Sequence, residues 1–143
     1  MFVGGRRHRG RCVPNVISTP WTVAALVIFL AKQLVADFLL QTSWMANGKE
    51  QPRGWLYPLL AHVAVHAVST AVIFAILAPA FLWMAAVDFV VHFAIDRAKG
   101  LLNRAFDADP TKTGFWWLIG IDQTLHHLTH LVYAILIAVV RTG

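Results

Sequence analysis

Cysteine is almost missing from this 143-residue sequence, in which Cys12 is the single thiol. One thiol excludes an internal disulfide framework and a metal cluster held by thiolates. Charge is also scarce, because charged residues make up 13% of the chain, against roughly a quarter in ordinary soluble domains. Hydrophobic residues reach 58%, and the mean hydropathy is +0.62. A soluble domain of this length could not bury so much apolar side chain, so we predict an integral membrane protein.

The chain is long enough for one domain and has no internal repeat or low-complexity segment. We predict an arginine-rich tail over residues 1–19 and a transmembrane domain over residues 20–143. The apolar segment after the tail continues through Gln33 and Asp37 without a clear cleavage site, so we interpret it as a retained helix and not as a signal peptide. Arginines before a membrane span usually serve topology or lipid contact, and no nucleic-acid partner is expected.

Four apolar segments are each close to the ~20 residues that cross the hydrocarbon layer of a bilayer. The predicted spans cover residues 21–45, 55–77, 81–104 and 115–140, with polar turns at 47–54 and 107–114. All six tryptophans fall near the ends of these spans, where amphipathic rings prefer the membrane interface. The predicted architecture is all-α: a polytopic membrane protein built as an up-down bundle of four transmembrane helices.

Polar residues interrupt every predicted span at intervals of four, so each set projects from one helical face. The sets are Gln33, Asp37 and Gln41; His62 and His66; Asp88, His92 and Asp96; and Asp122, His126 and His130. We call the membrane face at which the first span ends the exit side. A rise of 1.5 Å per residue in an alternating bundle brings residues from all four spans to one depth near that side. At this depth lie Asp37, His62, Asp96 and Asp122, with His66, His92 and His126 about one turn deeper.

An ionised side chain in mid-membrane costs roughly 2.5–3.5 kcal/mol on insertion scales and normally has a partner. Carboxylates and neutral imidazoles are ligands of divalent cations, whose charge would offset theirs. We therefore predict a site for one or two divalent ions of zinc, manganese or iron. The expected ligands are Asp37, His62, His66, His92, Asp96, Asp122, His126 and His130, oriented by Gln41, Gln123 and His127. A structural hydrogen-bond network and a proton or ion pathway are the alternatives, and Lys32 and Asp88 are candidates for a buried ion pair deeper in the bilayer.

Four segments together resemble the domain-of-unknown-function 3307 family of small bacterial membrane proteins. They are QLVADFLLQTSWMANGK, AHVAVH, HFAIDRAK and GIDQTLHHLTH, and the resemblance covers about residues 30–135. It singles out Asp37, Gln41, His62, His92, Asp96, Asp122, Gln123 and His126, whereas the arginine-rich tail departs from the family pattern. The resemblance implies a multi-pass protein of the cell inner membrane and implies no biochemical activity.

The leading functional hypothesis is a metal-dependent hydrolase that acts on a lipid or lipid-linked phosphoester at one membrane face. A bound metal ion lowers the pKa of its water and polarises a phosphoryl oxygen. Asp37 or Asp122 is the expected general base. Six basic residues near the exit side suit an anionic headgroup and, by the positive-inside rule, predict a cytoplasmic location for that side. They are Lys49, Arg53, Arg97, Lys99, Arg104 and Lys112, of which Arg97 and Lys99 are expected to touch the substrate.

Two further hypotheses remain open at this point. The histidine spacings of HVAVH and HHLTH superficially resemble those of membrane desaturases, which favours a di-iron oxidase that modifies lipids. A chain of titratable aspartates and histidines could instead relay protons or ions. The polar residues crowd the exit side and leave the other side apolar, an arrangement more typical of a pocket than of a pore.

Overall fold

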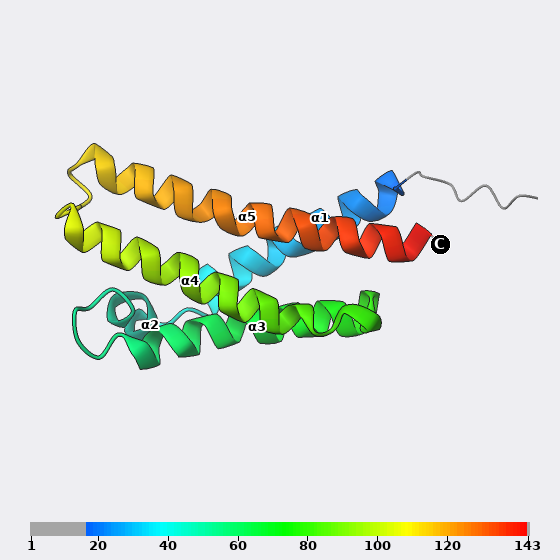
Figure 1. The fold of residues 1–143 in the computed structure, drawn as a ribbon, viewed down its shortest axis with the longest axis horizontal. Helices are drawn as coiled ribbons and strands as arrows, with labels where there is room; N and C mark the ends of the chain where they lie inside the picture. Colours follow the sequence, from blue (N-terminus) through cyan, green and yellow to red (C-terminus); the bar gives the residue numbers. More distant parts are fainter. Residues whose placement is uncertain (1–16, 143) are drawn as a thin grey trace, which may run out of the picture.

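The computed structural model describes residues 17–142 of the chain (Figure 1). Within this range all regular elements are helical, which confirms the predicted all-α class. They are α1 (Thr19–Leu34), the π-helical turn η1 (Val35–Leu39), α2 (Ser43–Gly48), α3 (Leu56–Leu77), the 3₁₀ turn η2 (Pro79–Phe81), α4 (Met84–Ala105) and α5 (Thr113–Thr142). The arginines predicted to form an N-terminal tail lie outside the described residues.

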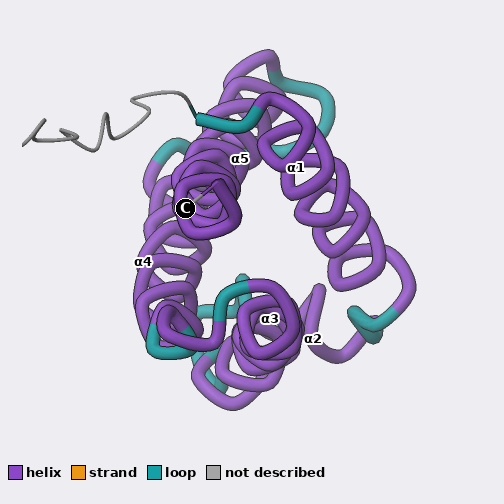
Figure 2. The backbone as a smooth tube through the Cα atoms, turned by 90° about the vertical axis from the view of Figure 1, so that its right-hand side faces the viewer, coloured by secondary structure: helices purple, strands orange, loops and turns teal. Residues whose placement is uncertain are grey.

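The four long helices alternate in direction, as Figure 1 shows. Around the bundle, α1 packs on α5, α5 on α4 and α4 on α3, and the end view in Figure 2 shows this order. We call the end with α2 and the α4–α5 connection the loop end, and the opposite end the terminal end. At the terminal end the backbone N–H of Ser18 donates to Oγ1 of Thr142 over 3.1 Å. The loop end corresponds to the predicted exit side.

Among residues 17–142, three helical segments are long and apolar enough to cross a membrane: Thr19–Leu39, Leu56–Leu77 and Thr113–Thr142. Helix α4 has the same 22-residue length as α3. It falls short on composition because it carries five charged side chains, Asp88, Asp96, Arg97, Lys99 and Arg104. Three of the four predicted spans therefore have the length and composition of membrane helices. That α4 also spans the membrane stays a prediction.

The first predicted span is wrong at its exit-side end, because the helix does not continue to residue 45. It widens into η1, where the N–H of Leu40 donates to the carbonyl of Val35 over 2.9 Å, and then it ends. Thr42 begins α2 by accepting a hydrogen bond from the N–H of Met45 at 3.3 Å. Threonine is a favoured helix N-cap, and here that local preference stops the first helix and starts a second.

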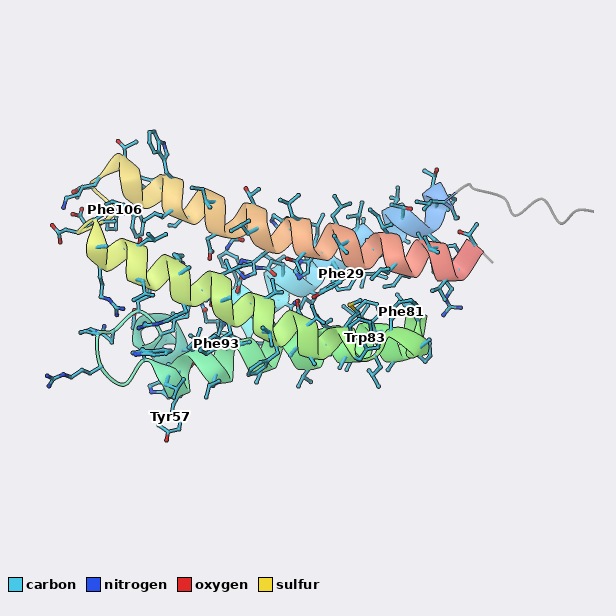
Figure 3. All side chains as sticks on the ribbon, viewed as in Figure 1. Phe29, Tyr57, Phe81, Trp83, Phe93 and Phe106 are labelled. Atoms are coloured by element: carbon cyan, nitrogen blue, oxygen red, sulfur yellow. The ribbon has the colours of Figure 1, made fainter. Side chains whose placement is uncertain are left out.

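Apolar side chains cover both the outside of the bundle and its interior at the terminal end. Outward residues such as Val27, Val72 and Val132 are more than half exposed and would face lipid. In Figure 3, Tyr57 near the loop end also points away from the bundle. The buried apolar core at the terminal end consists of Ala25, Phe29, Phe74, Ala78, Tyr133, Ala134 and Ile137. The interior of the loop-end half is available for polar groups.

The connection between α4 and α5 is polar and organised by its own side chains. The hydroxyl and the N–H of Thr111 both donate to Asp109 and hold the pKa of that carboxyl below its usual range. Lys112 pairs with Asp107 over 2.7 Å. These groups are exposed, as expected for a loop in water at the end of a membrane bundle.

Candidate metal centre

A layer of charged residues borders the apolar core on the side of the loop end. The ammonium of Lys32 on α1 donates to Oδ2 of Asp88 on α4 over 3.2 Å, and both side chains are buried. The hydroxyl of Thr70 donates to the same carboxylate oxygen over 2.7 Å. This is the buried ion pair that the sequence analysis indicated. This ion pair separates the apolar half of the interior from the polar half.

His130, one of the predicted ligands, belongs to this layer. Its Nε2 accepts from the Lys32 ammonium over 3.2 Å, and its ring stacks on Phe29 with centroids 5.2 Å apart. An ammonium has only donors, so the accepting nitrogen is already used by Lys32. The structure therefore separates His130 from the other histidines of the predicted set.

One turn nearer the loop end, an aspartate and three histidines converge. Their ligand atoms lie within 4.8 Å of one another, and they are Asp37, His62, His66 and His92. The Nε2 atoms of His66 and His62 lie 3.1 and 3.6 Å from Oδ1 of Asp37. The Nε2 atoms of His62 and His92 lie 3.4 Å apart. The four side chains come from three elements, η1, α3 and α4.

These separations match those of metal ligands. Bonds of 2.0–2.2 Å to a tetrahedral zinc ion put neighbouring ligand atoms about 3.3–3.6 Å apart. Hydrogen bonds between the same groups would have similar lengths, so distance alone does not decide between the two. Nε2 of His62 also faces carboxylate oxygens of Asp37 and Asp96, and its single proton can serve only one acceptor, whereas a cation attracts all of them.

A second group adjoins the first and shares His92 with it. It consists of His92, Asp96 and His126, whose ligand atoms also lie within 4.8 Å of one another. His126 supplies the clearest tautomer, because its Nδ1 lies 2.9 Å from the backbone carbonyl of Asp122. A carbonyl only accepts, so Nδ1 carries the proton and Nε2 has a free lone pair. That Nε2 is buried without a hydrogen-bond partner among the described residues.

A cavity of about 200 Å³ lies beside the two groups. It is lined by Asp37, Phe38, Gln41, Ala46, Lys49, Glu50, His92, Asp96, Lys99, Asp122, Gln123 and His126. Four carboxylates and two lysines among them leave a formal charge of −2 when the two histidines are neutral. The lysines pair with the acids: Lys49 donates to Asp96 over 2.8 Å, and Lys99 lies 3.4 Å from Glu50 and 3.9 Å from Asp122.

Amide side chains orient two of the acids. Gln33 donates to Oδ2 of Asp37 over 2.6 Å, and Gln123 donates to Oδ2 of Asp122 over 3.2 Å. Gln41 reaches the backbone carbonyl of Asp37 over 3.2 Å. His127 differs from its expected role, because it is exposed and its nearest aromatic neighbour is His130, with centroids 6.5 Å apart.

Asp122 does not join the ligand groups expected to include it, and Arg97 lies away from the position expected of a substrate contact. Asp122 lines the cavity but belongs to neither ligand group. The guanidinium of Arg97 lies 3.6 Å from the ring centre of Trp55 and does not line the cavity. The sequence placed Lys49 among the basic residues near the exit side but did not predict that Lys49 and Glu50 line the cavity. Their signal was a short charged turn directly after the first span, which is too weak to locate a side chain inside the bundle.

The described chain is thus a helical protein with membrane-type outer surfaces and a buried carboxylate–imidazole cluster at one end. The profile of the family described as "Protein of unknown function (DUF3307)" matches residues 25–142, and the chain belongs to this family. No curated protein and no solved structure matches it. The resemblance seen in the four sequence segments is thereby confirmed.

Proposed function

We propose that this protein is a membrane-embedded metal enzyme that hydrolyses a phosphoester on a lipid or lipid-linked molecule at one membrane face. The observation that carries the proposal is the meeting of six acid and imidazole side chains beside a cavity that also holds two lysines. Metal ligands, a candidate base and anion-binding groups then share one small space. A hydrogen-bond network alone would give no reason for a cavity at this place.

Charge favours a metal over a network of hydrogen bonds. The cavity lining carries a formal charge of −2 in an apolar surrounding, where an uncompensated charge is costly. One divalent ion would neutralise this charge, and two would make the cavity attractive to a phosphate. Asp37, His62, His66 and His92 form one proposed ligand set, and Asp96 and His126 with the shared His92 form the other.

A divalent ion at these ligands would supply Lewis acidity and an easily ionised water. We assign the base to Asp122, because it lines the cavity outside both ligand groups. Its carboxylate takes a proton from water while the water oxygen bonds to phosphorus. The phosphorus–oxygen bond to the alcohol then breaks, and the leaving alkoxide takes up a proton from solvent. Lys49 and Lys99 would bind the remaining phosphoryl oxygens.

Metal content and hydrolysis in matched aspartate variants test the proposal. We expect the detergent-purified protein to contain stoichiometric zinc, manganese or iron, and Asp96→Asn to lose part of it. Asp122→Asn should keep the metal and lower the hydrolysis of bis(para-nitrophenyl) phosphate by roughly 10²–10⁴-fold, the usual contribution of a general base. Asp107→Asn, in the exposed loop, is the control and should change neither.

Protein without stoichiometric metal would refute both the hydrolase and the di-iron alternative. Iron with a visible chromophore, without hydrolysis, would support the oxidase in place of the hydrolase. Transport is the weaker alternative, because fully buried Phe29, Phe74 and Ile137 fill the interior at the terminal end. The polar residues then form a pocket that is closed on that side.

A further inference from the structure

A narrow apolar slot lies between α4 and α5 and adjoins the polar cavity. It has a volume of about 60 Å³ and is lined by Ile95, Ala98, Lys99, Leu102, Leu118, Ile121, Asp122 and Leu125. Lys99 and Asp122 line both the slot and the polar cavity. On the same measure a single water needs a cavity of at least ~10–15 Å³, so the slot has room for a slender group and not for a bulky one.

An outer groove on α5 adjoins the slot, with two side chains shared between them. A shallow groove of about 440 Å³ on α5 is lined by Trp116, Trp117, Gly120, Ile121, Thr124 and Leu125. Ile121 and Leu125 line both the slot and this groove. At Gly120 a Cβ would meet no atom within 4 Å, which leaves the floor of the groove open. Shared lining residues therefore place the slot between the polar cavity and the groove on the lipid-facing surface.

The groove and the slot lie at the depth where the headgroup of a membrane lipid meets its acyl chains. The groove begins with Trp116 and Trp117 near the loop end of α5, and tryptophans prefer the depth of the headgroups. Lys99 has an apolar stem and a charged tip, and it lies where the apolar slot meets the polar cavity. A molecule with an anionic head and a hydrocarbon chain matches both surroundings at once.

We infer that the substrate is a membrane lipid that enters sideways between α4 and α5. Its phosphate lies in the polar cavity against Lys99, and one acyl chain runs through the slot onto the outer groove of α5. This inference rests on the proposed function for the phosphate head. It adds the route of entry and the residues that select a slender chain, of which Ala98 is the smallest side chain in the slot.

Photo-crosslinking of the full chain in phosphatidylcholine nanodiscs tests this route without any turnover. The probes are phosphatidic acid and phosphatidylcholine that carry the same diazirine near the end of one acyl chain. We expect labelling of residues 95–102 and 118–125 to be roughly fivefold higher with phosphatidic acid, as one lysine near an anionic lipid implies. Labelling of the outer face of α3 at Val68 and Val72 should be equal with both probes, since these side chains are exposed at a distance from the slot.

A matched pair of variants separates slot binding from general lipid contact. Ala98→Trp should fill the slot and remove the preference for phosphatidic acid, whereas Ala86→Trp, at an exposed alanine of α4 outside the three cavities, should leave it intact. Equal labelling by both probes in the unaltered protein, or an unchanged preference in Ala98→Trp, overturns the inference. Metal content is measured in parallel, so a failure of the proposed metal centre is seen independently of the lipid route.

Discussion

At the scale of single residues, Lys32 and Asp88 are two charged groups whose burial costs free energy unless they pair. Both side chains are buried next to the apolar core. The carboxylate of Asp88 receives hydrogen bonds from Lys32 and Thr70, and the ammonium of Lys32 also reaches His130. Each charge is therefore compensated only while its partner is present. Removing one partner of a buried ion pair is expected to destabilise the protein more than removing both, because the remaining charge is left uncompensated.

We predict that Lys32→Met destabilises the protein by about 3–5 kcal/mol, because it leaves the Asp88 carboxylate buried without a counter-charge. The double variant Lys32→Met/Asp88→Leu should recover most of that loss. The measurement is the unfolding midpoint in detergent as denaturant is added. Lys112→Met, which removes an exposed pair with Asp107, serves as the control and should be almost neutral. If Lys32→Met changes the unfolding midpoint as little as this control does, the buried ion pair is contradicted.

Residue spacing in the sequence could predict which side chains meet, but not how each one is bonded. Polar residues four apart within an apolar span must share a helical face. Helix rise and alternation then bring Asp37 and His62 to one depth, with His92 about one turn deeper. The hydrogen bond that gives His126 its tautomer depends on the local backbone, and the contact of Arg97 with Trp55 depends on the angle between two helices. Neither is encoded in spacing along one helix.

At the scale of elements, the short helix α2 carries the chain from the end of η1 to α3. Its packing brings the next residue, Lys49, to Asp96 on α4, with 2.8 Å between the charged atoms. Helix rise and alternation could predict the four long helices. They could not predict η1 and α2, because both arise from a balance between local capping by Thr42 and packing against α3. The first span was therefore predicted as one continuous helix, without the break at η1.

Gly48, the last residue of α2, lies against Pro58 at the start of α3. A Cβ built at Gly48 would come within 2.5 Å of Cγ of Pro58, and the proline ring cannot turn away. We predict that Gly48→Ala destabilises the protein by roughly 1–3 kcal/mol, the usual cost of overpacking, although alanine is the better helix former. It should not lower the metal content, since the ammonium of Lys49 competes with a cation for the Asp96 carboxylate.

The measurements are the unfolding midpoint and the metal content of the purified variant. Gly114→Ala is the matched control, because a Cβ at Gly114 would meet no atom within 4 Å. A Gly48→Ala protein that is as stable as this control would show that α2 is free to shift. The close packing of α2 on α3 would then have no role in the site.

At the scale of the whole molecule, polarity changes in steps from one end to the other. The terminal end is apolar inside and is closed by Arg141, which donates to the last carbonyls of α3 at Ile76 and Leu77. The Lys32–Asp88 pair follows, then the ligand groups, and finally the cavity with its lysines. This order favours a pocket that is entered from the loop end or from its side.

The same arrangement supports the prediction that α4 crosses the membrane, although its composition alone does not show it. Helix α3 ends at the terminal end and α5 begins at the loop end, and both are long and apolar enough to span. The chain must return between them, and 22 residues of helix cover ~33 Å. Its acids Asp88 and Asp96 are buried inside the bundle, and bilayer-facing Val90 is exposed.

We predict that membrane-impermeant maleimide labels Gln51→Cys and Thr111→Cys from one side of sealed vesicles and Ala80→Cys only from the other, each in a Cys12→Ser background. Gln51 and Thr111 lie in exposed turns of the loop end, and Ala80 lies in the exposed turn between α3 and α4. Val90→Cys, midway along α4, should resist the reagent from both sides because lipid covers it. If Ala80→Cys is labelled from the same side as Gln51→Cys, then α3 and α4 do not cross, and the polar cluster lies outside the bilayer. The cost of burying charge in lipid would then no longer support a bound cation, and the charge of −2 in the cavity would have to be compensated by water.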